Sequence, residues 1–259
     1  SASGMRRRHY YTDADRFEQS LDVYTPDVPP PATPTLPLVL LVVGSAWLGH
    51  RSIIYDGTSW WNSAGPKTVA KVGATCVCIR HRGAFPRPPT GLFVFVMALA
   101  FRAVAQSQAV SMLTAVLLLL AWHVGARGAA SHAEMMDDVA LALRWVRAHR
   151  SELGPAPGAA PAAKTVFGGY SSGAHVAACL LQRPDVLSAH GLPPAAELCD
   201  GVLLLSGVLG TRLTNAPAAA PRGAPALTDT ISAVVFGRAA AATLPSPVHD
   251  VGASPRLPH

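Results

Sequence analysis

A short stretch near residue 170 constrains the fold more than any other part of the chain. Residues 165–175 read TVFGGYSSGAH, an apolar run followed by glycines and serines. A short apolar run bounded by glycine indicates a buried strand. The alanine-rich residues after it indicate a helix, and glycines on both sides of Ser171 permit a turn that larger side chains would obstruct. The pattern predicts a strand that turns at Ser171 directly into a helix.

Predicted strands and helices alternate along the rest of the chain. Aliphatic and β-branched runs indicate strands at residues 21–24, 36–43, 74–80, 164–169 and 201–206. Helices are predicted at residues 64–72, 133–150 and 172–181, and Ser131 and Glu134 have capping-box spacing ahead of the second. The alternation predicts an α/β fold, a mostly parallel sheet with helices on both faces. We expect a single domain over residues 1–259, with an N-terminal tail at residues 1–18.

Composition excludes several classes of protein. Half of the residues are hydrophobic and 14% are charged, which excludes a disordered chain. The formal net charge of +6 comes partly from Arg6, Arg7 and Arg8, which we interpret as part of a solvated tail, with contact to anionic lipid as the alternative. No basic stripe alternates with aromatic residues, so we expect no nucleic-acid partner.

The four cysteines do not have the spacing of a metal site. Cys76 and Cys78 lie two apart in a predicted strand, so both side chains are expected on one face of the sheet. Cys179 and Cys199 are distant in sequence, and no paired C-x-x-C motif is present. We predict four free buried thiols, no metal, no organic cofactor and an intracellular, reducing location.

Ser171 is the candidate nucleophile. Residues 169–173 (GYSSG) match the pattern G-x-S-x-G, in which the serine lies at a strained corner between a strand and a helix. The corner exposes the hydroxyl at the carboxyl edge of the sheet and directs the backbone N–H of the next residue, Ser172, towards a developing oxyanion. The alternative is a glycine- and serine-rich turn without chemistry.

A second oxyanion donor is expected from the loop after an earlier strand. The backbone N–H groups of Gly44 and Ser45, directly after the strand predicted at residues 36–43, are the candidates. Preorganised donors of this kind stabilise the transition state of acyl transfer. The alternative is an ordinary turn at a strand end.

Together these segments resemble the α/β-hydrolases that include prenylcysteine methylesterases, kynurenine formamidases and related carboxylesterases. The resemblance runs from about Leu21 to the end of the chain. Residues 169–181 (GYSSGAHVAACLL) are the closest part, and residues 138–149 (DVALALRWVRAH) are similar to the helix before the nucleophile strand. Residues 43–47 fall where the family has His-Gly-Gly-x-Trp, with Val43 and Ser45 in place of the histidine and the second glycine.

The resemblance also concerns the residues that would activate the serine. In this fold an acid and then a histidine follow the serine along the chain. Residues 246–249 (SPVH) are similar to a family segment that precedes the last two strands, which carry both groups. By this alignment the last strands are missing, and we expect either a fragment of an active esterase or a degenerate hydrolase without turnover. Within the chain, His249 is the candidate base, with Asp250 or Asp229 to orient it.

The remaining histidines near the predicted site are weaker candidates. His175 lies on the helix after Ser171 and is predicted to be structural. His190 lies in a predicted loop, His259 is terminal, and His50 follows the oxyanion loop.

A strongly apolar insertion is predicted at residues 91–126. Two runs, 92–101 and 109–122, are separated by polar residues, which predicts a helical hairpin. Both ends of the insertion join one domain, so a single membrane crossing is excluded by topology. Residues 92–125 therefore predict either a hairpin that contacts a membrane or a cap over the active site, and the family resemblance suggests a lipidic substrate.

The sequence favours an enzyme that cleaves an ester or amide of a small molecule through an acyl-enzyme on Ser171. The rival hypothesis is a catalytically silent, membrane-associated interaction protein with a hydrolase fold. A nucleotide-binding protein is a weaker third interpretation, because residues 168–173 lack the spacing G-x-G-x-x-G.

Overall fold

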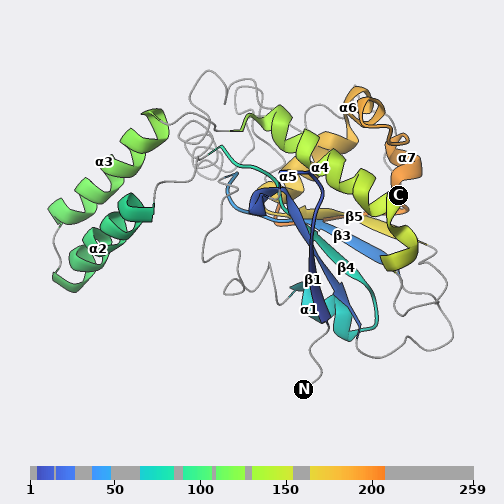
Figure 1. The fold of residues 1–259 in the computed structure, drawn as a ribbon, viewed down its shortest axis with the longest axis horizontal. Coiled ribbons are helices and arrows are strands. Elements are labelled where there is room, and N and C mark those ends of the chain that lie inside the picture. The colour runs from blue at the N-terminus through green and yellow to red at the C-terminus, as the bar shows by residue number, and fades with distance from the viewer. Residues whose placement is uncertain are drawn as a thin grey trace, which may run out of the picture.

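The computed structural model describes residues 5–14, 16–26, 37–47, 65–84, 90–106, 109–125, 130–153 and 164–207. The candidate residues His50, Asp229, His249, Asp250 and His259 lie outside these ranges. Figure 1 shows a sheet with helices packed on it and, apart from this body, a pair of helices.

The described strands form one six-stranded sheet in the order β1-β2-β4-β3-β5-β6. Strands β4, β3, β5 and β6 are parallel, whereas β1 and β2 join the edge in antiparallel fashion. The α/β fold with a mostly parallel sheet is therefore confirmed. The strands are β1 (Met5–Tyr10), β2 (Ser20–Thr25), β3 (Leu38–Val42), β4 (Cys76–Ile79), β5 (Thr165–Tyr170) and β6 (Gly201–Leu205).

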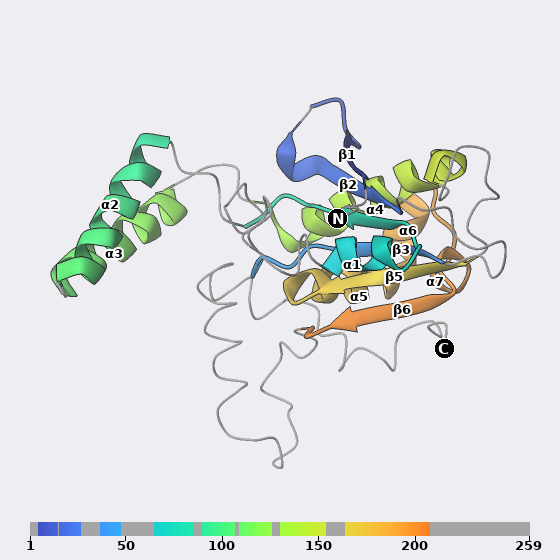
Figure 2. The ribbon, with the colours of Figure 1, turned by 90° about the horizontal axis from the view of Figure 1, so that it is seen from below.

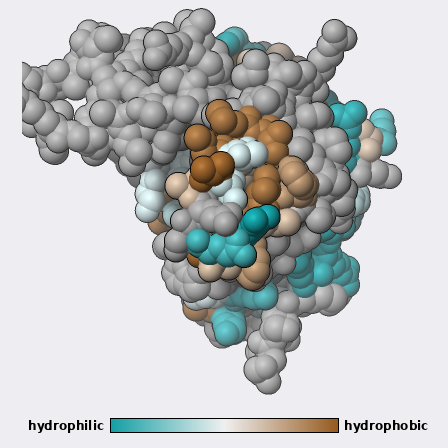
Figure 3. Space-filling view, turned by 90° about the vertical axis from the view of Figure 1, so that its left-hand side faces the viewer, coloured by the Kyte–Doolittle hydropathy of each residue, from teal (hydrophilic) through white to brown (hydrophobic). Residues whose placement is uncertain are grey.

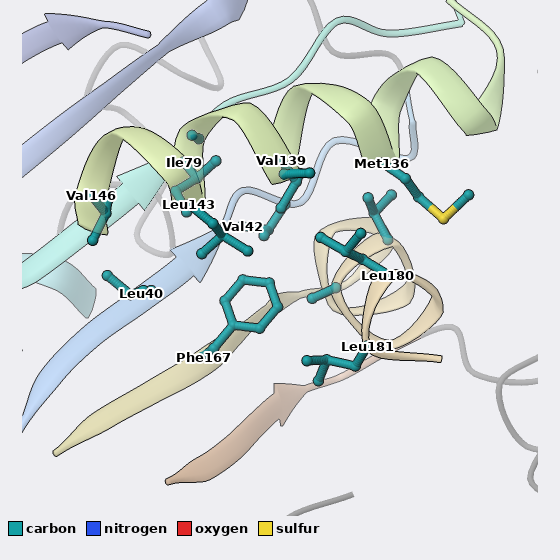
Figure 4. Close-up of a cluster of buried hydrophobic side chains, with 14 of the residues drawn as sticks. Leu40, Val42, Ile79, Met136, Val139, Leu143, Val146, Phe167, Leu180 and Leu181 are labelled. Atoms are coloured by element: carbon teal, nitrogen blue, oxygen red, sulfur yellow. The ribbon is translucent and has the colours of Figure 1, made fainter. Parts of the chain in front are cut away.

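Helices cover both faces of the sheet, as predicted. Alternate strand residues such as Val42, Ile79 and Phe167 pack with α4 (His132–Ala148) and α5 (Ser172–Leu181), as Figure 4 shows. On the opposite face, Cys76 and Cys78 pack against α1 (Gly65–Lys71). Figure 2 shows α1 and the strands from below. Both cysteines face one side of the sheet. All four cysteines are buried, and none of them forms a disulfide.

Several predicted elements form with small shifts at their ends. The capping box at Ser131 and Glu134 is present, and α4 ends at Ala148, before a short 3-10 helix at Arg150–Leu153. Two short helices, α6 (Pro184–Ala189) and α7 (Ala195–Leu198), lie where no element was predicted. They connect α5 to β6 at the side of the sheet that carries α4.

The predicted N-terminal tail is wrong. Residues 5–10 form the edge strand β1, which pairs with β2 along its whole length, and a 3-10 helix follows at Phe17–Gln19. Arg6 and Arg8 project to one face of β1, where both bind the buried carboxylate of Asp22. The arginines therefore hold a strand in place instead of extending into solvent.

The apolar segment forms two antiparallel helices, α2 (Thr90–Gln106) and α3 (Ala109–Gly125). Both views show this hairpin standing apart from the sheet (Figures 1 and 2). Small and medium side chains are buried in it, namely Val96, Ala103 and Ala115. No helix in the described part of the chain combines the length and the hydrophobicity needed to cross a bilayer.

Candidate active site

The strand-to-helix corner at Ser171 has the strained backbone that its pattern predicts. Ser171 lies between β5 and α5 with φ 53° and ψ −123°, a conformation that costs a non-glycine residue free energy and persists only where the surroundings enforce it. Its N–H donates to the carbonyl of Leu205 at 2.9 Å, and its own carbonyl accepts from the N–H of His175 at 3.2 Å. The next strand and the first turn of α5 thus hold the corner.

Glycines allow the backbone segments at this corner to pack closely. A Cβ at Gly169 would lie 2.6 Å from the carbonyl carbon of Gly173, and one at Gly173 would lie 2.3 Å from the carbonyl oxygen of Val42. Heavy atoms do not approach so closely, so both positions require glycine. The close approach brings the start of α5 directly against the end of β3, and Ser171 remains partly exposed.

The loop after β3 lies against the corner. A Cβ at Gly44 would lie 2.3 Å from the carbonyl oxygen of Tyr170 and 2.9 Å from Cβ of Ser171, which places the Gly44 backbone beside the candidate nucleophile. Ala46 and Trp47 follow with φ of 51° and 59°, so the loop turns sharply away. The structure therefore brings Gly44, Ser171 and Ser172 together, as the sequence predicted.

Ser45 has a different contact from the predicted one. Its backbone N–H donates to the side-chain Oγ of the fully buried Ser172 at 2.9 Å. In this arrangement the Ser45 N–H fixes the loop to α5, and the Gly44 N–H is the remaining candidate of the two for an oxyanion. The sequence indicated the backbone of Ser172 as a donor but did not reveal the role of its hydroxyl.

The described residues do not supply a base next to Ser171. His175 is fully buried, as predicted for a structural residue, and its ring contacts Trp47, His132 and Cys179. His190 caps the end of α6 and pairs with Asp137 of α4 at 2.9 Å. Within the described ranges, no hydrogen bond joins a histidine ring to Ser171 Oγ.

A polar cluster lies behind the corner, and sequence analysis missed it. Trp47 Nε1–H donates to His175 Nδ1 at 3.2 Å, and His132 Nε2 lies 3.2 Å from the same atom. Burial, followed by the charges of His175, His81 and Arg183, lowers the pKa of His132 to about 3, so its ring is neutral. The only local signal was the spacing of His175 and Cys179, which places both on one side of a helix.

Comparisons with known proteins support the fold. No family model matches the sequence, and no curated protein matches it either. Among solved structures, C6-C4 SN3 inhibited esterase B from Lactobacillus rhamnosis has a TM-score of 0.51 at 15% identity. The match covers 92% of this chain and 58% of that chain. A second structure of esterase B from the same organism also has a TM-score of 0.51 at 15% identity, covering 91% of this chain and 57% of that chain.

These similarities concern architecture. The chain spans a little over half of the length of the esterases that it matches. At such low identity the likeness shows a shared fold and not a shared substrate. The chain therefore has an α/β-hydrolase type of fold.

Proposed function

We propose that the protein is a serine hydrolase of the carboxylesterase type, with Ser171 as nucleophile. The observation that carries the proposal is the strained backbone of Ser171 at the end of β5, with the Gly44 loop packed against it. Strain of this kind is concentrated at functional sites because it presents a side chain in an otherwise unfavourable position. The partial exposure of Ser171 permits a small ester or amide to reach it.

The proposed reaction is acyl transfer to the serine and then to water. Ser171 Oγ attacks the acyl carbon while a base takes its proton, and the N–H groups of Ser172 and Gly44 bind the oxyanion that forms. The tetrahedral intermediate expels the alcohol or amine and leaves an acyl-enzyme, which water hydrolyses. The base comes from outside the described residues, and His249 with Asp250 are its candidates within this sequence.

Hydrolysis of p-nitrophenyl acetate, together with labelling by a fluorophosphonate probe, tests the proposal. We expect both signals from the full chain and their loss in Ser171→Ala. Ser188→Ala is the matched control, because Ser188 is an exposed serine of α6 far along the chain from the corner. Equal labelling of the wild-type chain and Ser171→Ala would contradict the assignment of the nucleophile. A further His249→Ala variant that keeps full activity would exclude His249 as the base.

A second candidate function is attachment to a lipid surface through the α2–α3 hairpin. This function would hold whether the protein is an active enzyme or is catalytically silent. Large apolar side chains are exposed on both helices, and Figure 3 views the molecule from the side where the hairpin projects. Exposed apolar surface on this scale is unusual in a protein that has no partner there. A lipidic acyl substrate would fit such a location. The residues concerned are Phe95, Met97, Phe101, Val104, Val110, Met112, Leu113, Val116 and Leu117.

Flotation with neutral phosphatidylcholine vesicles tests this second function. We expect the wild-type chain to float, and the double variant Phe101→Gln with Val104→Gln to float less, because both side chains are about three-quarters exposed. Arg144→Gln on the exposed side of α4 is the control. Flotation that is equal in all three proteins, or absent from all, would contradict a role for the hairpin.

A further inference from the structure

Three side chains of metal-ligand type meet in the core behind the candidate nucleophile. His132 is the first residue of α4, whereas His175 and Cys179 lie on α5. All three are buried, and one ligand atom from each lies within 4.8 Å of those of the other two. The reaction proposed for Ser171 uses none of them.

The backbone explains why these side chains converge. His175 and Cys179 are four residues apart on a helix, so they lie one above the other on the same face. Packing of α4 on α5 then brings the first turn of α4 to that face. His132 Nε2 lies 3.2 Å from His175 Nδ1, and Cys179 Sγ lies 3.6 Å from His175 Nε2.

The 3.2 Å between His132 Nε2 and His175 Nδ1 is close to the spacing of neighbouring ligand atoms in a metal centre. Cys179 Sγ approaches the His175 ring at Nε2, and the three ligand atoms lie within 4.8 Å of one another. Zinc–nitrogen and zinc–sulfur bonds in a tetrahedral site place neighbouring ligand atoms about 3.3 to 3.6 Å apart. Two imidazoles and one thiolate are borderline and soft ligands, which favour zinc and similar transition metals over magnesium or calcium. The His132 ring is held in place because it belongs to the capped start of α4.

A third buried imidazole lies near enough to His132 that, besides burial, its charge lowers the pKa of that ring. His81 is 2% exposed, and its Nδ1 lies 2.6 Å from the carbonyl oxygen of Arg82. A contact so short to an acceptor assigns the proton to Nδ1, which leaves a lone pair on Nε2. Within the described ranges, His81 Nε2 has no hydrogen-bond partner. An orphaned buried acceptor is costly.

We propose that His132, His175 and Cys179 form a binding site for a zinc-class divalent cation. Binding exchanges the indole N–H at His175 Nδ1 for the metal and releases the thiol proton of Cys179 to solvent, with no change of oxidation state. His175 then keeps its proton on Nε2, beside the ligating sulfur. The bound ion joins the start of α4 to α5, and so stabilises the helix that follows Ser171.

Cobalt(II) titration of the full chain, after removal of metal with a chelator, tests this site. We expect the visible absorption bands of protein-bound cobalt(II) together with a thiolate-to-cobalt charge-transfer band, all abolished by added zinc. Cys179→Ala should lose the charge-transfer band and bind at least about tenfold more weakly. Cys199→Ala is the matched control, because Cys199 is equally buried but contacts the Ala195 carbonyl of α7 instead.

A second variant and a second measurement keep the test decisive. His132→Gln, at the start of α4, should also weaken cobalt binding about tenfold or more, and serves if Cys179→Ala does not fold. Zinc should raise the thermal unfolding midpoint of the wild-type chain and of Cys199→Ala, but not of the other two variants. Folded wild-type protein without the cobalt bands, or bands that survive both site variants, would overturn the proposal. Neither readout depends on hydrolytic activity.

Discussion

At the scale of single residues, the corner around Ser171 depends on backbone segments that touch. Three glycines, Gly44, Gly169 and Gly173, each lie where an added Cβ would come within 2.6 Å of a neighbouring backbone atom. These contacts let β3, β5 and α5 meet without side chains between them. The geometry of the candidate site therefore depends on these three glycines as much as on the serine.

Gly173→Ala should destabilise the protein. The new methyl would lie 2.3 Å from the Val42 carbonyl oxygen, which belongs to a central strand and cannot move freely. Overpacking of this kind costs roughly 1 to 3 kcal/mol. Urea denaturation followed by circular dichroism measures the change.

Gly65→Ala is the control for that substitution. Nothing lies within 4 Å of a Cβ at Gly65, and alanine has the higher helix propensity, so α1 should be unaffected or slightly stabilised. Equal unfolding midpoints for the two alanine variants would show that the backbone around Gly173 can move enough to accept a methyl group.

Residue patterns predicted only part of this site. Ser171, Ser172 and Gly44 could be proposed from the sequence because local motifs place them next to a turn. The cluster of Trp47, His132 and His175 was missed because its members are 43 or more positions apart, and single-sequence patterns do not report which distant side chains meet. The bond from the Ser45 N–H to the Ser172 hydroxyl was missed for the same reason.

At the scale of elements, one buried carboxylate joins the antiparallel edge to the rest of the sheet. Asp22 of β2 is fully buried and pairs with Arg6 and Arg8 of β1 and with Arg80, which follows β4. Arg8 and Arg80 also lie over the ring of Phe17. The first strand is therefore attached by charge pairing as well as by its ladder.

Asp22→Asn should alter the pH dependence of stability. Burial raises the pKa of Asp22, but hydrogen bonds from Arg80 and Arg8 and the charges of Arg80 and Arg6 outweigh it and lower the pKa to about 2. Because the folded-state pKa is below the unfolded value, this carboxylate stabilises the fold above about pH 4, and the contribution is lost as pH falls towards 2. The variant should lose roughly 3 kcal/mol at neutral pH and show a weaker decline in acid.

Denaturant titrations at several pH values between about 7 and 3 measure this effect. Asp185→Asn is the control, because Asp185 also pairs with an arginine, Arg183, but on the exposed surface, where an ion pair contributes little. If the free energy of unfolding of the wild-type chain did not change with pH, the lowered pKa of Asp22 would be contradicted. The same would follow if the wild-type chain and Asp22→Asn lost stability in parallel as the pH falls.

The cap of α4 allows a second test of an element. Ser131 accepts the N–H of Glu134, and the Glu134 side chain accepts the N–H of Ser131. Ser131→Ala should lower stability by about 1 kcal/mol, as measured by urea denaturation. Ser188→Ala, at an exposed position of α6, should change the free energy of unfolding much less. An equal loss of stability in Ser188→Ala would show that the cap is not the cause of the effect of Ser131→Ala.

Elements with a hydrophobic period were predictable, and elements without one were not. Helix α4 has an apolar face and a capping signal, and β5 has an apolar run before glycine, so both were predicted within a few residues. The edge strand β1 reads MRRRHY. Its arginines suggested a solvated tail, because the charge that they neutralise, Asp22, appears only once the strands pair.

At the scale of the whole molecule, the described residues that flank the α2–α3 hairpin on its two sides lie next to each other. The N–H of Ala130 donates to the carbonyl of Gly83 at 2.9 Å, and the N–H of Ala84 donates to the Trp47 carbonyl at 2.8 Å. The chain therefore leaves the body and returns to it at adjacent residues. An added segment with neighbouring ends can be tolerated by a fold without disturbing its core.

Replacement of residues 90–125 by a flexible Gly/Ser linker of about six residues should leave the sheet folded. We expect a cooperative thermal transition within a few degrees of the wild-type midpoint, because the main hydrophobic core contains no hairpin residue. Vesicle flotation should disappear at the same time, because the exposed apolar side chains are gone. An unfolded product would show that the hairpin supports the sheet, and a folded product that still floats would place lipid contact elsewhere. The full-length double variant Phe101→Gln with Val104→Gln separates these results, since it keeps both helices while losing two exposed apolar side chains.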